Sequence, residues 1–222
     1  MEAGAAVNAA RTSDGRTALH VAAAAGSLEL CTLIAGQEGV EVDKREALGH
    51  DPQTALQLAV VHGSEALVSL LLDAGADPDV TDAKQAGPLH AAAARGQDAL
   101  VKLMLDAGAN PNALNADQES PLLLAAKADS EASVRVLVEG GAEVDAKLSG
   151  GDTVLHKMAA AESAPMVQLL LAAGADPHAP NTAGLVPSLV TNSEQIAEML
   201  EGGDVVEALS IGKKKDPAAA GG

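Results

Sequence analysis

Residues 87–112 read GPLHAAAARGQDALVKLMLDAGANPN, and this stretch decides the fold. Pro88 suits the first turn of a helix, where its missing N–H costs no hydrogen bond. Leu89 and the alanines three and four residues after it share one helical face. Gly96 is suited to end this helix in a left-handed turn, and a second, largely apolar helix runs on to Gly108. The stretch therefore predicts two antiparallel helices joined by a tight turn.

The same pattern recurs along the chain, which identifies an array of repeated units. It is marked by a leucine in each first helix, at Leu19, Leu56, Leu89, Leu122 and Leu155, and by a glycine after each later second helix, at Gly75, Gly108, Gly141 and Gly174. The leucines from position 56 onward are 33 residues apart. Such units cannot bury their apolar faces alone, so we expect them to stack, each contacting only its neighbours. The first step, from position 19 to 56, is longer, and we expect a bulging loop within residues 36–52.

The tetrapeptides around the leucines resemble the signature of a known family. Residues 17–20 read TALH, residues 87–90 read GPLH and residues 153–156 read TVLH. With the period of 33 and the Gly-Ala-Asp ends, these closely resemble the Thr-Pro-Leu-His signature of the ankyrin-repeat family. The resemblance implies an all-α solenoid of paired antiparallel helices with short β-hairpin loops. It also implies a structural role, bonding within and between hairpin loops, for His20, His90 and His156.

The repeat boundaries predict how the chain is organised. The units are expected at residues 11–43, 44–79, 80–112, 113–145 and 146–178, followed by a degenerate cap at 179–201. Residues 1–10 are interpreted as the remnant of a preceding repeat or as an N-terminal arm. Residues 202–222 are expected to form a short helix and a disordered tail that contains Lys213–Lys215.

Some positions depart from the pattern. Asp129 and Glu162 replace the glycine that ends the first helix, and Leu123 replaces the histidine of the fourth unit. In the third unit we expect Leu103 to be buried between two neighbours. The alanine-rich first helices allow units to approach closely, at the cost of less apolar area per residue.

Charge and composition exclude several classes of protein. The 222 residues include 14 Lys and Arg against 31 Asp and Glu, which gives a net charge of −17, and no Phe, Tyr or Trp. Nucleic-acid binding is not expected, because it needs cationic side chains and, for single strands, aromatic platforms. No apolar run is long enough to cross a bilayer. The N-terminus lacks the basic start of a secretion signal, so we expect a protein of the cytoplasm or nucleus and not a secreted one. We also expect a monomer.

No pattern in the sequence points to catalysis. Cys31 is the single cysteine, which rules out an internal disulfide or a thiolate zinc cluster. The glycine pairs end helices and do not open them, so none forms a phosphate-binding loop. We therefore expect no enzyme activity, no cofactor and no bound metal.

The family resemblance implies a protein–protein interaction scaffold, an adaptor or inhibitor. In the family, hairpin tips and the concave face of the first helices bind the partner. By position, the candidate partner-binding residues here are Arg16, His50, Asp51, Gln53, His62, Lys84, Arg95, Asp117, Glu119, Lys127 and Asp152. Arg95 and Lys127 are basic positions in an acidic chain, suited to bind a partner's carboxylate. The negative charge favours a partner with a basic surface.

Two other functions remain open at this stage. One is an assembly or targeting chaperone for client proteins. The other is an accessory interaction domain excerpted from a larger multidomain protein or enzyme. The resemblance also implies that Asn112 occupies the position of the hairpin asparagine that is a target of hydroxylation in this family.

Overall fold

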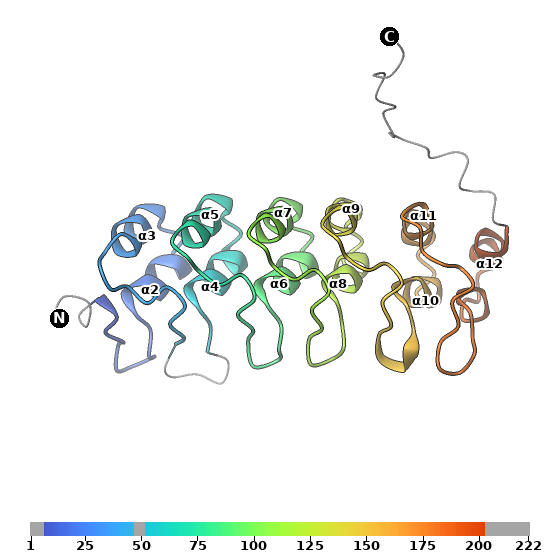
Figure 1. The fold of residues 1–222 in the computed structure, drawn as a ribbon, viewed down its shortest axis with the longest axis horizontal. Helices are drawn as coiled ribbons and strands as arrows, with labels where there is room; N and C mark the ends of the chain where they lie inside the picture. The colour runs from blue at the N-terminus through green and yellow to red at the C-terminus, as the bar shows by residue number, and fades with distance from the viewer. Residues whose placement is uncertain (1–6, 47–51, 203–222) are drawn as a thin grey trace, which may run out of the picture.

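The computed structural model describes residues 7–46 and 52–202, which form a row of stacked helix pairs (Figure 1). The inner helices are α2 (Ala18–Ala24), α4 (Ala55–His62), α6 (Pro88–Ala94), α8 (Pro121–Lys127) and α10 (Val154–Ala160). The outer helices are α3 (Leu28–Ala35), α5 (Glu65–Asp73), α7 (Asp98–Asp106), α9 (Glu131–Glu139), α11 (Ala164–Ala172) and α12 (Glu194–Glu201). Figure 1 shows the inner helices as a middle layer between the outer helices and a row of loops. The predicted all-α solenoid is confirmed.

The loops between pairs fold back on themselves as hairpins. One main-chain hydrogen bond closes each such loop, from Asp82 N to Ala86 O at 2.9 Å before α6 and from Asn115 N to Glu119 O at 3.1 Å before α8. Neighbouring hairpins also touch, because Ala116 N donates to Lys84 O at 2.8 Å. These single bonds are too few to make a ladder, so no strand is formed in the described part of the chain.

Helix starts follow from the residues placed before them. Thr54 and Thr153 accept a hydrogen bond from the backbone N–H three residues on, at the start of an inner helix. The serine N-caps of outer helices do the same, namely Ser27, Ser64, Ser130 and Ser193. Such a cap satisfies an N–H that has no partner within the helix.

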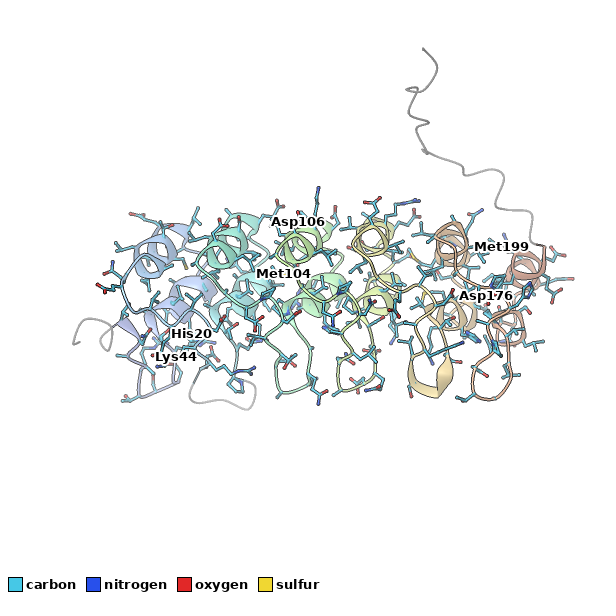
Figure 2. All side chains as sticks on the ribbon, viewed as in Figure 1. His20, Lys44, Met104, Asp106, Asp176 and Met199 are labelled. Atoms are coloured by element: carbon cyan, nitrogen blue, oxygen red, sulfur yellow. The ribbon has the colours of Figure 1, made fainter. Side chains whose placement is uncertain are left out.

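The core runs along the row as one continuous cluster of leucine, methionine and small alanine side chains. Met104, labelled in Figure 2, is fully buried between units. Leu103, which was expected to be buried there, is only half-buried. The reason is the helical period: one residue is a rotation of about 100°, so Met104 faces the neighbouring helices and Leu103 lies at their edge.

Asp129 and Glu162 keep the backbone geometry of the glycines they replace. Both have a φ of 55°, close to the 62° of Gly96 and the 67° of Gly26 at the equivalent positions. The left-handed region is unfavourable for residues with a Cβ, by about 1–2 kcal/mol. The array therefore holds these two residues under local backbone strain.

A ladder of side-chain acceptors links each unit to the next at the base of the loops. Its members each accept a hydrogen bond from a backbone N–H one unit further along: Asn8 from Glu41, Asp43 from Asp77, Asp79 from Asn110, Asn112 from Glu143, and Asp145 from Asp176. The distances lie between 2.8 and 3.0 Å. Asn8 thus accepts the same hydrogen bond as the acceptors at the ends of the later units.

The stacking is less regular between the fourth and fifth units. A cleft of about 380 Å³ opens between α9 and α11, lined by Val134 and Val138 on one side and by Leu169 and Ala172 on the other. The inner layer is also less connected here, because the apolar Leu123 has no hydrogen-bonding atom to offer the next loop.

The last unit is reduced. A single 3₁₀ turn, Pro187–Leu189, replaces the inner helix. The outer helix α12 buries Ile196 and Leu200 against the row and exposes Glu194, Glu198 and Glu201. In the described residues, no helix is long and apolar enough to cross a membrane.

Candidate interaction surface

Buried histidines fasten the loops to the inner helices. The backbone N–H of Gly87 donates to Nδ1 of His90 at 3.1 Å, and Nε2 of His90 lies 3.1 Å from the carbonyl of Ala113 in the next loop. Because Nδ1 accepts, the ring proton is on Nε2, which donates to the carbonyl. His20 and His156 make the corresponding contacts, to Gln53 O and Leu185 O at 3.0 Å.

Burial favours the neutral form of His20 and His90. Burial lowers the pKa of His90 below its usual value, although the carbonyl of Ala113 and the nearby carboxylate of Asp82 oppose this. Burial likewise lowers the pKa of His20. A neutral ring is what the hydrogen bonds require, because a proton on Nδ1 would remove the acceptor for the backbone N–H.

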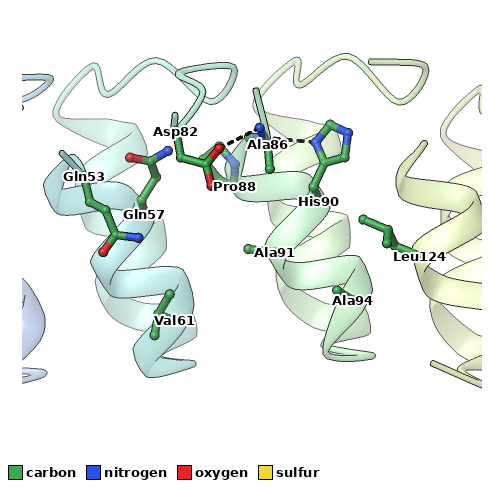
Figure 3. Close-up of a pocket in the computed structure, with 11 residues that line it drawn as sticks. Gln53, Gln57, Val61, Asp82, Ala86, Pro88, His90, Ala91, Ala94 and Leu124 are labelled. Atoms are coloured by element: carbon green, nitrogen blue, oxygen red, sulfur yellow. Dashed lines mark hydrogen bonds between the residues drawn. The ribbon is translucent and has the colours of Figure 1, made fainter. Parts of the chain in front are cut away.

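A groove opens beside the inner helices of the second and third units. It has a volume of about 220 Å³, and Figure 3 shows the side chains that line it. The apolar part comprises Val61, Ala91, Ala94 and Leu124, and the polar part comprises Gln53, Gln57, Asp82 and His90. Val61 is 46% exposed. The groove thus presents an apolar floor with polar groups along the loop side.

The loop side of this groove is rigid. Asp82 Oδ1 accepts the backbone N–H of Lys84 and of Ala86, both at 2.8 Å. Gln57 accepts the N–H of Thr54 at 2.9 Å and donates to Val80 O at 3.1 Å. These bonds fix the polar groups in place before any ligand arrives.

Several predicted contact residues already have partners within the chain. Arg16 pairs with Glu46 at 2.6 Å, which joins the first loop to the second. Lys127 pairs with Glu119, and the hydrogen bond from Lys127 holds the pKa of the Glu119 carboxyl below its usual value. The charge of Lys127 is therefore balanced locally.

Asp152 is held in a similar way in the fifth unit. It pairs with Lys157 at 2.7 Å and accepts a hydrogen bond from Asn181 at 2.8 Å. Burial alone would raise the pKa of Asp152, but the hydrogen bonds from Lys157 and Asn181 outweigh it, and the pKa is lowered.

Arg95 and Lys84 are different. Both are exposed, and neither has a carboxylate partner among the described residues. Arg95 caps the end of α6 beside Ala94 in the groove, and its guanidinium reaches only the carbonyl of Ala91, at 3.4 Å. It therefore presents an uncompensated positive charge at the edge of the groove.

The remaining predicted residues lie at the ends of loops and helices. His62 is exposed at the end of α4, and its ring lies over Gly26 of the first unit, where a Cβ would come within 2.2 Å of Nε2. Asp117 is exposed at a loop tip. Gln53 lines the groove. His50 and Asp51 lie outside the described residues.

Comparison of the sequence with known protein families agrees with the repeated helix pairs of the structure. The sequence model of a family described as ankyrin repeats (3 copies) matches residues 1–82 and 89–181. The chain belongs to the ankyrin-repeat family. Ankyrin repeats serve protein–protein interaction, so the surface described above is a candidate site for a protein partner.

One relative of the ankyrin array is the E3 ubiquitin-protein ligase KEG of Arabidopsis thaliana. It is 37% identical over 93 residues, which is 42% of this chain and 6% of the relative. The similarity thus covers a small part of a much longer protein.

Sequence reasoning missed Gln57, Asp82 and Leu124 of the ankyrin groove. Gln57 was detectable, since it stands at the histidine position of the second tetrapeptide. Leu124 was also detectable as a large side chain at the position that Ala91 holds in the third unit. Asp82 gave no signal, because many acidic residues occur in these loops.

No metal site emerges from the described part of the ankyrin array, where no three His, Cys, Asp or Glu side chains converge. Cys31 is buried in the core, and burial raises the pKa of its thiol. A buried thiol of raised pKa is a poor nucleophile, because the thiolate is the reactive form.

Proposed function

We propose that this ankyrin array is a non-catalytic scaffold, an adaptor or inhibitor, that binds a partner protein through its loop tips and concave face. The observation that carries the proposal is the groove beside Arg95. It combines an apolar floor, fixed polar groups and one uncompensated guanidinium. Interfaces concentrate binding energy in such settings, where an arginine lies within an apolar patch.

The charge of the chain supports a partner with a basic surface. A net charge of −17 attracts such a partner over a distance and speeds association, more strongly at low salt. At the groove, Arg95 binds a carboxylate within that otherwise basic partner. We propose that the array acts as a monomer in the cytoplasm.

A kinetic binding experiment tests the site. The partner is first identified by cross-linking and mass spectrometry, and binding is then measured by surface plasmon resonance. Arg95→Ala should raise the dissociation rate at a cost of roughly 1–3 kcal/mol. Glu139→Ala, on the exposed side of α9, is the control and should leave affinity unchanged. Weaker binding for Glu139→Ala alone would show that the partner uses the outer helices.

A second candidate is an accessory interaction domain of a larger enzyme. It is favoured by the relative, an E3 ubiquitin-protein ligase that this chain matches over a small fraction of its length. In that case the array would recruit a protein to the enzyme. Sequencing full-length transcripts distinguishes the two, because only the second candidate requires a catalytic domain in the same reading frame.

A further inference from the structure

Ala91 leaves the inner helix of the third unit short of one leucine side chain. The equivalent residues of the neighbouring units are Leu58 and Leu124, each 33 residues away. Ala91, Leu124 and Val61 line the groove of about 220 Å³ beside the inner helices. Figure 3 shows Val61 and Leu124 on either side of α6, which carries Ala91. The groove therefore has room at the position where both neighbouring units carry a leucine.

Opposite charges lie at the two ends of this groove. Asp82 lines its loop side, and no Lys or Arg of the described residues pairs with it. Its Oδ1 holds the loop, whereas its Oδ2 accepts no hydrogen bond within the described chain. Arg95 directly follows Ala94 at the far end of α6, and its guanidinium reaches only the carbonyl of Ala91. Figure 3 shows Asp82 at the loop end, Ala91 midway along α6 and Ala94 toward the far end. The groove is thus negative at one end, apolar in the middle and positive at the other end.

The length of the groove fits an extended segment that presents alternate side chains to it. The helix α6 (Pro88–Ala94) spans about 10 Å, and Asp82 and Arg95 lie beyond its two ends. In an extended chain, the side chains of residues i−2, i and i+2 point to the same side and together cover about 13 Å. A central residue over Ala91 therefore places the outer two at the charged ends.

The loop side of the groove also offers a partner for an extended backbone. The side-chain amide of Gln53 lines this side and makes no hydrogen bond to the rest of the described chain. The backbone N–H and C=O groups of an extended segment are free to bind such an amide, whereas those in the middle of a helix are already bonded to one another. An extended segment therefore suits the groove better than a helix.

We propose that the groove binds an extended segment of a partner protein with the pattern Lys-x-Leu-x-Glu, where x is any residue. The lysine lies against Asp82, the leucine over Ala91 and the glutamate against Arg95. The proposal rests on the proposed function, because it specifies the chemistry of the partner at the same groove.

The test uses the full chain and fluorescent peptides of about nine residues, too short to form a stable helix. The first peptide carries Lys-x-Leu-x-Glu with serine at x, and the second has the same composition with Lys, Leu and Glu adjacent. Binding is measured by fluorescence anisotropy. The second peptide should bind at least about tenfold more weakly, because its leucine and its charged residues point to opposite sides. Equal binding of both peptides, or no binding of the first, overturns the proposal.

Filling the groove tests the place of the leucine. Ala91→Leu should weaken binding of the first peptide by at least about tenfold, because the new side chain takes the space of the leucine in the peptide. The array already holds leucine at the equivalent positions of both neighbouring units, so circular dichroism and melting should show a folded chain. Ala160→Leu is the control, since Ala160 is exposed on α10 outside the groove. Equal losses for the two variants overturn the proposal.

Reversing a charge tests the place of the glutamate. Arg95→Glu should weaken binding of the Lys-x-Leu-x-Glu peptide and strengthen binding of a Lys-x-Leu-x-Lys peptide, since opposite charges then meet again. Arg135→Glu changes the net charge equally, but Arg135 is exposed on α9 outside the groove, so it should not change which peptide is preferred. The same change of preference in both variants would show that net charge alone selects the peptide, and the proposal is then wrong.

The partner identified by cross-linking separates this proposal from the function on which it rests. Loss of partner binding in both Arg95→Ala and Ala91→Leu supports both. If only Arg95→Ala weakens the partner, the scaffold function stands and the Lys-x-Leu-x-Glu pattern is wrong. If the peptides behave as expected but the partner is indifferent to both variants, the groove selects the pattern and the proposed partner site is wrong.

Discussion

Gln57 in the second unit makes the same two hydrogen bonds as His90 in the third. Each side chain accepts the N–H that precedes its helix, from Thr54 at 2.9 Å and from Gly87 at 3.1 Å. Each also reaches a carbonyl of the next loop at 3.1 Å. The position therefore needs an acceptor and a donor on a short planar group. The important difference is that only histidine titrates near neutral pH.

This difference predicts how stability depends on pH. Burial lowers the folded pKa of His20 and His90, so between the folded and unfolded pKa values the unfolded chain binds more protons. Stability is then lost as the pH falls below about 6.5, the usual histidine value. Each histidine contributes a slope of at most about 1.4 kcal/mol per pH unit. The double variant His20→Gln and His90→Gln should therefore show a flatter dependence in urea unfolding between pH 7 and 5.

Gln57→His is the reciprocal control. It should add a buried histidine and steepen the loss of stability over the same range. Keeping the measurement above pH 5 separates this effect from Glu119 and Asp152. Their lowered pKa values contribute stability that is lost mainly as the pH falls below about 4.5, the ordinary glutamate value. If the free energy of unfolding depended on pH with the same slope in all variants, the lowered pKa values of the buried histidines would be contradicted.

Replacing the strained residues with glycine should stabilise the array. Glu162→Gly removes a Cβ from a backbone with a φ of 55°, a relief of about 1–2 kcal/mol. The added freedom of the unfolded chain offsets about 0.4–1 kcal/mol of this. We expect a net gain of up to about 1 kcal/mol in urea unfolding, and a smaller gain for Asp129→Gly, because aspartate tolerates this region better. Gly96→Glu is the control and should destabilise, since a Cβ there would lie 3.0 Å from Ser130.

Truncation of the core should cost far more than truncation of a loop tip. Met104 is fully buried, and Met104→Ala should lower the free energy of unfolding by roughly 2–5 kcal/mol. Lys84→Ala, at an exposed tip, should stay within about 0.5 kcal/mol of the natural chain. Comparable losses in chemical denaturation would be inconsistent with stacked units.

The ladder between units can be tested at Asn112. Its oxygen accepts Glu143 N at 2.8 Å, and its amide donates to Gly141 O at 3.2 Å. Asn112→Ala should cost roughly 1 kcal/mol and speed hydrogen exchange at the Glu143 amide. Asn112→Asp keeps the acceptor, as Asp79 does in the preceding unit, but loses the donor to Gly141 O, so it should still protect the Glu143 amide although it lowers stability. If both variants exchange alike at Glu143, the side-chain acceptor does not protect that amide.

Local pattern and period were sufficient to predict the helices and their order. They predicted that Asp129 and Glu162 stand at glycine positions, because this depends on register alone. Register did not predict that Met104 rather than Leu103 would be the buried side chain. That distinction depends on the rotation of α7 against both neighbours, which becomes known only when the units are stacked.

The candidate site was harder to predict than the fold. The spacing placed Arg95 and Lys127 near the ends of inner helices in neighbouring units, and both were expected to bind a partner. The structure pairs Lys127 with Glu119 and leaves Arg95 without a carboxylate among the described residues. Side-chain pairing depends on how each loop folds over its own helix, and the repeat period contains no information about that.

The cleft between α9 and α11 bears on how the array responds to force. A stacked array behaves like a spring, whose stiffness at each junction follows from the contacts made there. Leu123 supplies no hydrogen bond to the fifth unit, and the outer helices part above it. Pulled from its two ends in an optical trap, the array should yield first at this junction. The first four units would then recoil as one elastic segment and the last two as another.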